Sequence, residues 1–323
     1  MSAPLHLPVM VDEVVDVLRP VPPGLLVDAT VGAGGHSRAL LDARPDSTLL
    51  GLDRDGDALA VAATSLAPFG DRVALAHVRF DALAETVGEH GHERVAGVLF
   101  DLGVSSMQLD RPDRGFSYRS DAPLDMRMDR SQPTSAADVV NGYDARRLAE
   151  VIGTHGGERF AGRIARAIVS ARPIATTDQL AGVVREAIPA PARRRGGDPA
   201  RRTFQALRIE VNTELAAIAP ALDQAIDLLV PGGRVAVLAY HSGEDRIVKE
   251  RFNRAATGGC TCPPGLPCAC GAVPTVRLVW RGTHKPSATE IEANRRAESA
   301  RFRAVEKLPV ENLPVEKLPV ETP

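Results

Sequence analysis

The sequence predicts an α/β protein in which a doubly wound parallel sheet is interrupted by an inserted, mostly helical domain. Three observations predict this fold. Short apolar runs that end in aspartate alternate with helical segments over roughly the first hundred residues. The alternation then stops for about a hundred residues, which is longer than an ordinary connecting loop. It resumes afterwards, so we expect residues 1–106 and 213–305 to form one core and residues 107–212 to form the insertion.

The first part of the core shows its strands as apolar runs next to turn residues. Leu25–Asp28 follows Pro-Pro-Gly and is the first predicted strand, and a glycine-rich turn and a helix starting near Ser37 come after it. The next strand is Leu49–Asp53, and a helix at Asp57–Leu66 follows. Two more strands and the second part of the core complete the pattern: Val73–Ala76, Val98–Asp101, a helix at Ala216–Leu229, Val235–Leu238 and Val276–Trp280.

The charge of the chain is unevenly distributed. The formal net charge is −2, yet residues 107–212 carry +5, so the remainder carries −7. A positively charged middle segment suggests a surface that faces a polyanion, although an arginine-rich composition with solvated faces gives the same count. No apolar run is long enough to span a bilayer and no secretory signal is visible at the N-terminus, which predicts a cytoplasmic protein.

The insertion has helical signals and a dense group of arginines. Phe160, Ile164 and Ile168 recur at helical spacing and form one apolar stripe, with three arginines, Arg159, Arg163 and Arg166, on the neighbouring face. Thr177 is the expected cap of a helix at 178–187. The densest positive patch is the candidate RNA-binding site, and its alternative is a solvated surface loop. It consists of Arg193, Arg194, Arg195, Arg201 and Arg202.

The turn at Gly32–Ser37 and the carboxylate of Asp53 predict a nucleoside-containing cofactor. A glycine turn between a strand and a helix lets the backbone approach a ligand closely. Ser37 replaces the last glycine of the dinucleotide-binding fingerprint, and no phosphate-loop lysine follows. Asp53 stands 21 positions after Gly32, where a carboxylate accepts ribose hydroxyls. Phe80 and Asp101 follow the next two strands, at the ligand-binding edge of such a sheet.

Two segments near the C-terminus leave alternatives open. Cys260-x-Cys262 and Cys268-x-Cys270 place four thiols within one short segment, which fits either a structural zinc site or a reduced loop. Residues 306–323 repeat a proline-containing motif every five residues. Regular prolines forbid a continuous helix, so we expect an extended, disordered tail, and a peptide that docks on a partner is the alternative.

A series of longer motifs resembles the signature of the ribosomal RNA small subunit methyltransferase H family. The resemblance runs in order from about His6 to Lys307 and is densest in the stretch Phe100–Asn141. The matching motifs are His6–Val9, Asp101–Asp110, Arg114–Tyr118, Pro123–Asp129, Ala137–Asn141, Arg202–Ile209, His241-Ser242 and Glu244–Lys249. The chain departs from the family pattern at Asp198 and Arg201, where His and Thr are usual, at Gly243 in place of Leu, and at Arg295 in place of Pro.

The resemblance implies a class I fold dependent on S-adenosylmethionine, with an inserted substrate-recognition domain. It implies methylation of the N4 amine of a cytidine in the decoding centre of 16S ribosomal RNA, within the small ribosomal subunit. It also implies how the cofactor is held. Gly34, Gly35 and His36 would meet the methionine part, Asp53 the ribose and Phe80 the adenine, and Asp101 and Gln108 would complete the pocket. The change at Asp198 puts in doubt an imidazole contact to RNA at that position.

The proton acceptor has two candidates, Asp101 and His241. The N4 amine of cytosine is a poor nucleophile, because its lone pair is delocalised into the ring, so the site must orient it and accept a proton. A capping or core role for His241 is an alternative. Two alternative functions are a nucleotide-dependent oxidoreductase, which the missing third glycine disfavours, and a non-catalytic ribosome assembly factor that binds cofactor and RNA.

Overall fold

The computed structural model describes residues 8–193, 198–263 and 269–309. The chain forms two compact units, one built from the segments up to Gly103 and from Ala217 onward, the other from Val104–Ala216. We call the first the sheet unit and the second the insertion. The sequence-based boundaries of 107 and 212 lie within a few residues of these divisions. Each unit has its own buried apolar core.

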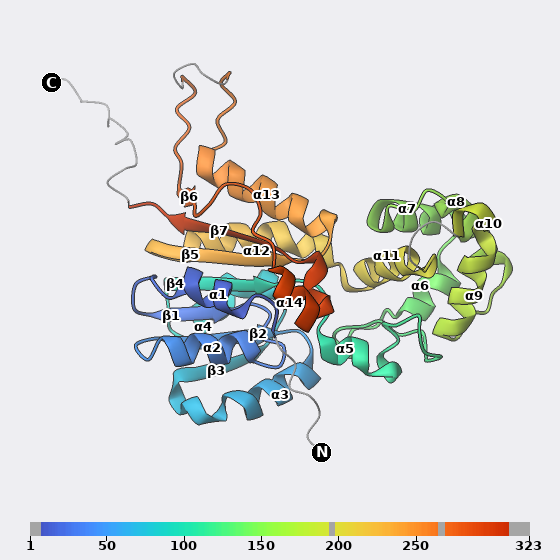
Figure 1. The fold of residues 1–323 in the computed structure, drawn as a ribbon, viewed down its shortest axis with the longest axis horizontal. Helices are drawn as coiled ribbons and strands as arrows, with labels where there is room; N and C mark the ends of the chain where they lie inside the picture. The colour runs from blue at the N-terminus through green and yellow to red at the C-terminus, as the bar shows by residue number, and fades with distance from the viewer. Residues whose placement is uncertain (1–7, 194–197, 264–268, 310–323) are drawn as a thin grey trace. The chain divides into compact units, whose positions relative to one another are not determined.

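The sheet unit confirms the predicted α/β class, with one correction to the strand directions. Its seven strands have the order β3-β2-β1-β4-β5-β7-β6 (Figure 1). The first five pair in parallel, whereas β7 is antiparallel to both of its neighbours, so the sheet is mixed. The strands are β1 (Leu25–Asp28), β2 (Thr48–Asp53), β3 (Val73–His77), β4 (Val95–Asp101), β5 (Leu229–Ala239), β6 (Val276–Leu278) and β7 (Arg301–Lys307).

Some helices of the sheet unit begin or end at local capping groups. Asp55 accepts from the backbone N–H of Asp57 and begins α3, and the glycine at 258, with a positive φ of 62°, ends α13. The helices are α1 (Val11–Leu18), α2 (Gly35–Ala43), α3 (Gly56–Leu66), α4 (Leu83–Glu89), α12 (Glu214–Leu228), α13 (Ser242–Thr257) and α14 (Ala288–Ala293). Short 3₁₀ segments are η1 (Ala67–Arg72), η2 (Phe80–Ala82) and η4 (Arg295–Ser299).

The core of the sheet unit lies between the strands and the helices α1, α2 and α3. Leu18 of α1 and Leu40 of α2 are both buried against β1, β4 and β5, and Leu66 of α3 is buried with Leu41 and Leu49. Burying each such leucine stabilises the fold by about 1.5–3 kcal/mol. This packing holds the carboxyl ends of the parallel strands in place.

Two late elements differ from the sequence-based prediction. The strand expected to begin at Val235 begins at Leu229, because the Pro-Gly-Gly turn forms a bulge: Val95 pairs with Leu229, and Gly97 pairs with Arg234. The repeat predicted to be disordered from residue 306 begins inside β7. There the Glu306 carboxylate accepts from the guanidinium groups of Arg234 and Arg277. The rest of the repeat, 310–323, lies outside the described residues.

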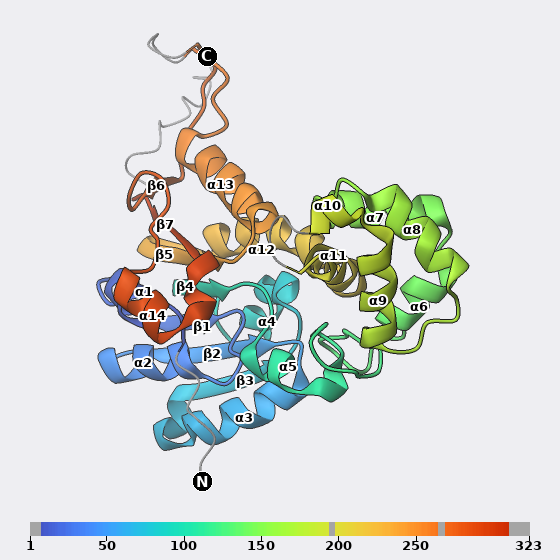
Figure 2. The ribbon, with the colours of Figure 1, turned by 45° about the vertical axis from the view of Figure 1, so that its right-hand side comes forward.

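The insertion is mostly helical, as Figure 2 shows. Ile164 and Ile168 of the predicted stripe are fully buried, and Phe160 packs at the edge of the same core. The expected cap at Thr177 is wrong by one residue: Thr176 accepts from the N–H of Gln179 and begins the helix. The helices are α5 (Ser106–Asp110), α6 (Ala136–Gly142), α7 (Ala145–Gly156), α8 (Ala161–Ser170), α9 (Thr177–Ala187), α10 (Ala190–Arg193) and α11 (Ala200–Asn212), with a 3₁₀ turn η3 (Pro112–Arg114).

Among the described residues, the structure contains no helix that is both long and apolar enough to cross a membrane.

Candidate active site

The strand order places three aspartates at one edge of the sheet. β1 pairs with β2 on one side and with β4 on the other, so the chain order reverses at β1. Open α/β sheets bind ligands at such a switch point, outside the carboxyl ends of the strands. Asp28, Asp53 and Asp101 are the last residues of β1, β2 and β4. The candidate site therefore lies along this edge.

The glycine turn after β1 adopts the backbone conformation that glycine favours. Gly32 and Gly34 have positive φ values of 53° and 84°. A Cβ atom at Gly35 would lie 2.4 Å from the Cγ atom of Pro8, so a side chain there would displace the N-terminal segment. Gly34 is the N-cap residue of α2 and offers no side-chain cap. The amides of the first turn of α2 therefore point toward a position suited to an anionic group.

Asp53 is held by backbone amides in a position suited to two hydroxyl donors. Its Oδ2 atom accepts from the N–H of Gly32 at 2.9 Å and its Oδ1 atom from the N–H of Asp55 at 2.9 Å. Each carboxylate oxygen can accept a further hydrogen bond. Burial raises the pKa of Asp53 to about 6, and the two amide donors oppose this rise. A ribose that donated two hydroxyls would satisfy the remaining acceptor capacity.

The two carboxyl oxygens of Asp101 lie in different surroundings. Oδ1 accepts from the Tyr240 hydroxyl at 2.6 Å, and Oδ2 lies 3.6 Å from Nδ1 of His36. The main chain of Asp101 is anchored as well, since its N–H donates to the Thr30 hydroxyl at 2.7 Å. The Asp101 side chain is 26% exposed and the His36 side chain only 6%. Asp101 thus keeps one oxygen, Oδ2, that takes no part in the hydrogen bond to Tyr240, in a side chain that solvent or a ligand can reach.

Burial raises the pKa of Asp101, and the nearby His36 ring and the Tyr240 hydroxyl partly offset this effect. Nε2 of His36 lies 2.8 Å from the carbonyl oxygen of Val9, which can only accept, so Nε2 carries the proton. When the ring is protonated, Nδ1 carries a proton as well, and the positive charge of the ring favours the ionised form of Asp101. A carboxyl with a raised pKa beside an imidazole nitrogen is suited to receive a proton at this position.

Asp28 and Tyr240 belong to this network and were missed from the sequence. The Asp28 carboxylate accepts from the Ser37 hydroxyl at 2.6 Å and from the N–H of Thr30, and so connects β1 with α2. Burial raises the pKa of Asp28. The only sequence signal for both residues was their position at the end of a strand, which many other residues share.

His241 caps a helix in the structure. Its Nδ1 atom accepts from the N–H groups of Gly243 and Glu244 at the start of α13, and Glu244 in return accepts from the N–H of His241. Nε2 lies 3.1 Å from Oε1 of Glu244, but the two atoms are not aligned for a hydrogen bond. One ring nitrogen is therefore engaged with the backbone and the other is adjacent to a buried carboxylate. The catalytic role of His241 stays a prediction.

Phe80 lies in η2 and contacts Phe100 edge to face, with ring centroids 5.8 Å apart. The ring is half-buried, so one part of it is accessible.

Gln108 belongs to the insertion, where it is buried in a capping box with Ser105 at the start of α5. The structure therefore describes the surroundings of Gln108 within its own unit, and its predicted contact with the cofactor stays a prediction.

The predicted arginine patch is only partly described. Residues 194–197, and the side chain of Arg193, lie outside the described residues. Arg201 and Arg202 are exposed in the first turn of α11, and Arg202 lies 3.7 Å from the carboxylate of Glu158. Further cations lie nearby in the sequence: Arg159, just before α8, stacks on the Phe160 ring at 4.6 Å, and Arg163 of α8 is exposed.

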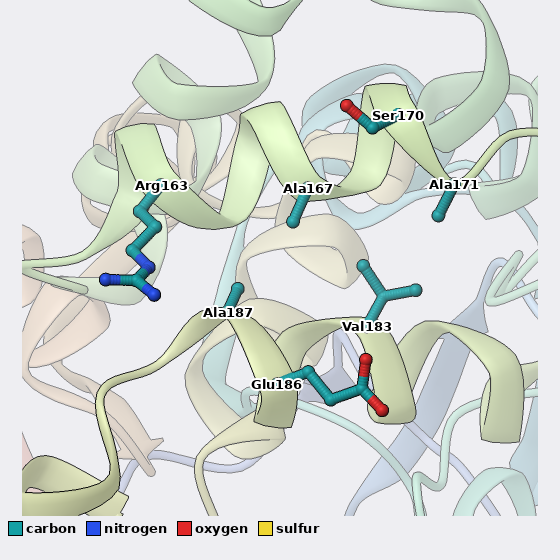
Figure 3. Close-up of a pocket in the computed structure, with 7 residues that line it drawn as sticks. All are labelled: Arg163, Ala167, Ser170, Ala171, Val183, Glu186 and Ala187. Atoms are coloured by element: carbon teal, nitrogen blue, oxygen red, sulfur yellow. The ribbon is translucent and has the colours of Figure 1, made fainter.

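An open cavity of about 380 Å³ lies between α8 and α9 of the insertion (Figure 3). Its floor consists of small apolar side chains, and the Arg163 guanidinium and the Glu186 carboxylate lie at its rim. The lining residues are Arg163, Ala167, Ser170, Ala171, Val183, Glu186 and Ala187.

Three of the four cysteines converge after α13. The sulfur atoms of Cys260, Cys262 and Cys270 all lie within 4.8 Å of one another, and the first and last are 3.6 Å apart. This separation is much longer than the roughly 2.05 Å of a disulfide bond. The N–H of Ala269 donates to the Cys262 sulfur at 3.4 Å, as backbone amides do toward thiolates. The fourth cysteine, Cys268, lies outside the described residues.

The chain matches proteins of one family over nearly its whole length. The model of the MraW methylase family matches residues 3–308. The ribosomal RNA small subunit methyltransferase H of Acidothermus cellulolyticus is 55% identical over 95% of this chain and 94% of its own length. Proteins of the same name from Mycolicibacterium smegmatis and Symbiobacterium thermophilum are each 51% identical over 94% of this chain, and over 84% and 96% of their own lengths.

These matches agree with the resemblance found in the sequence motifs, and they span both parts of the sheet unit and the whole insertion. Over the same residues the structure shows the glycine turn and the aspartates at the switch point of the sheet. Both kinds of evidence lead to the same conclusion: this chain belongs to the MraW methylase family.

Proposed function

We propose that this protein transfers a methyl group from S-adenosylmethionine to the N4 amine of a cytidine in the decoding centre of 16S ribosomal RNA, in the cytoplasm. One observation carries the catalytic part of the proposal. The Asp101 carboxyl lies at the switch point, beside the glycine turn, with one oxygen held and the other facing His36. The names of the relatives support ribosomal RNA as the substrate class.

The residues of the sheet unit fit the proposed cofactor. The first turn of α2, with Gly34, Gly35 and His36, suits the carboxylate of the methionine part, because its amides have no side-chain cap. Asp53 suits the ribose hydroxyls, and the accessible part of the Phe80 ring suits the adenine. When bound, S-adenosylmethionine supplies a methyl group that its sulfonium makes electrophilic.

The chain must orient the cytidine amine and take one of its protons. As the nitrogen gains the methyl group it gives up one of its two protons, and we assign Asp101 Oδ2 as the acceptor. His241 is the weaker candidate, because the helix amides of α13 already use its Nδ1 lone pair. A stacked cytosine cannot present its amine edge-on, so the target base must leave its stack.

A methyl-transfer assay tests this function directly. The purified protein is incubated with labelled S-adenosylmethionine and either protein-free 16S RNA or small ribosomal subunits, and the modified nucleoside is identified by mass spectrometry. We expect N4-methylation of a single cytidine. Binding of cofactor and RNA without any transfer would instead support a non-catalytic assembly factor.

We also propose that the insertion binds RNA through its arginines, since residues 107–212 carry +5 while the rest of the chain carries −7. Changing Arg193, Arg194 and Arg195 together to alanine should weaken RNA binding and flatten its salt dependence. Each lost phosphate contact should lower the slope of log K against log salt by about 0.7–0.9. Filter binding at several salt concentrations measures both quantities, with cofactor titration in parallel.

The matched control replaces three exposed arginines of the sheet unit, Arg19, Arg254 and Arg281. This control changes net charge by the same amount and should leave the slope unchanged. Equal effects of the two triple variants would show that overall charge, rather than this patch, determines RNA affinity. No effect of either would leave Arg159, Arg163 and Arg166 as the next candidates.

We propose that the four cysteines hold a structural zinc ion. Tetrahedral coordination with Zn–S distances of about 2.3 Å separates the sulfurs by about 3.8 Å, close to the 3.6 Å between Cys260 and Cys270. Protein purified without added metal should contain about one zinc per chain by mass spectrometry, and Cys262→Ser should lower this content. Four freely titrating thiols in metal-free native protein would contradict the proposal.

A further inference from the structure

The hydroxyl of Tyr240 makes a specific contact in the candidate site. Tyr240 follows β5 directly, and Asp101 ends β4, the strand beside it. The hydroxyl donates to Asp101 Oδ1 at 2.6 Å, near the short end of the range for such bonds. A donor at one oxygen restricts rotation of the carboxyl group and leaves Oδ2 as the oxygen toward His36.

The Tyr240 side chain is held in place by its surroundings. Its backbone N–H donates to Oε2 of Glu244 at 2.7 Å, so the residue is tied to the start of α13. Its ring lies against Gly103: a Cβ atom there would be 3.4 Å from Cδ2 of the ring. The ring also packs at the edge of the buried cluster that contains Phe302. With the backbone and ring restrained, the hydroxyl has little freedom to leave the carboxylate.

We propose that Tyr240 is a positioning residue, which orients Asp101 and stabilises its ionised form so that Oδ2 can receive the proton of the substrate amine. This inference rests on the proposed function, because it deepens the role given there to Asp101. A phenylalanine would keep the ring packing and lose only the donor. The effect of that change therefore separates the hydrogen bond from the structural role of the ring.

Several charged or titratable groups surround Asp101 and Tyr240 and shift the pKa values of these two side chains. His36 on α2 favours the ionised form of Asp101, while Glu244 on α13 opposes it. Asp28 on β1 interacts with Asp101, and Glu290 on α14 interacts with Tyr240. Burial raises the pKa of the Tyr240 hydroxyl well above its ordinary value, and Asp101, Glu244 and Glu290 add to this effect, so Tyr240 stays a donor at any working pH.

The test is the pH dependence of kcat for Tyr240→Phe with the full chain and RNA substrate. A hydrogen bond to a charged group is worth about 1.5–3 kcal/mol, which corresponds to a pKa change of about one to two units. We expect the acidic limb of the profile to move to higher pH by about that amount. Above the limb, kcat should stay within several-fold of the wild type, and cofactor affinity should be unchanged.

A matched control is Tyr143→Phe in the insertion, where the Tyr143 hydroxyl also donates to a carboxylate, that of Glu210, at 3.1 Å. This variant should leave the acidic limb in place. A fluorinated tyrosine at position 240, whose hydroxyl is a stronger donor, should move the limb in the opposite direction to Tyr240→Phe. An unmoved limb in both position-240 variants, or an equal loss of kcat at all pH values, would overturn the proposal.

A second measurement keeps this inference separate from the proposed function. Carbon-13 NMR of labelled aspartate reports the titration of Asp101 without any turnover, with Asp101→Asn used to assign its signal. We expect the titration midpoint to rise in Tyr240→Phe. A raised midpoint in a protein that never methylates RNA would sustain the Tyr240 contact and reject the proposed function. An unchanged midpoint would reject the contact itself.

Discussion

Asp101→Asn should lower kcat for RNA methylation by about 10²- to 10⁴-fold, the range that general acid–base catalysis contributes. Asparagine has nearly the same shape and can still accept from the Tyr240 hydroxyl, so the site should keep its geometry. It cannot take a proton from the substrate amine. Single-turnover kinetics with saturating cofactor and RNA measure this loss, and calorimetry checks that the cofactor still binds.

His241→Asn is the informative companion variant. Asparagine is a good N-cap residue, so α13 should keep its first turn while the imidazole is lost. We expect nearly normal kcat. The reverse outcome, an active Asp101→Asn and an inactive His241→Asn, would move the proton acceptor to His241. As a surface control, Asp16→Asn on α1 should leave kcat unchanged, because its side chain is 66% exposed in a pair with Arg19.

Asp53→Ala should weaken cofactor binding by about 2–4 kcal/mol, which is roughly a 30- to 900-fold rise in Kd. The variant removes the two carboxylate oxygens that would accept hydrogen bonds from the ribose hydroxyls. At least one of these lost hydrogen bonds is to a charged group. It also removes the acceptor for the N–H of Gly32, which helps to hold the glycine turn. Calorimetric titration with S-adenosylmethionine measures the change, and an unaltered Kd would remove Asp53 from the site.

The same carboxylate predicts how cofactor binding depends on pH. The pKa of Asp53 in the free protein is raised to about 6, so the group is protonated below that value. Hydroxyl donors favour the ionised form, and cofactor binding should therefore lower this pKa. Kd should be flat above pH 7 and rise by up to tenfold per unit as the pH falls below 6. Asp53→Asn should bind weakly at all pH values and lose this dependence.

Local sequence was sufficient to predict the α/β class, the glycine turn and the likeness to the family. These features are encoded by neighbouring residues: apolar runs bounded by turn residues, glycine where φ is positive, and motifs many residues long. The distance of 21 positions between Gly32 and Asp53 reflects one strand–turn–helix–strand unit, and the structure shows their hydrogen bond. The shared family, which the comparisons confirm, depends on residue order alone.

Pairing between distant strands decided the remaining features. Asp101 and Tyr240 are 139 positions apart, and they meet only because β4 and β5 pair in parallel across the insertion. The first residues of the C-terminal repeat join the sheet because Arg234 and Arg277 pair with Glu306. The sequence predicts His241 as a candidate proton acceptor. Its role as a helix cap follows only from the position at which α13 begins. Periodicity describes one segment at a time, whereas these contacts depend on which segments lie side by side.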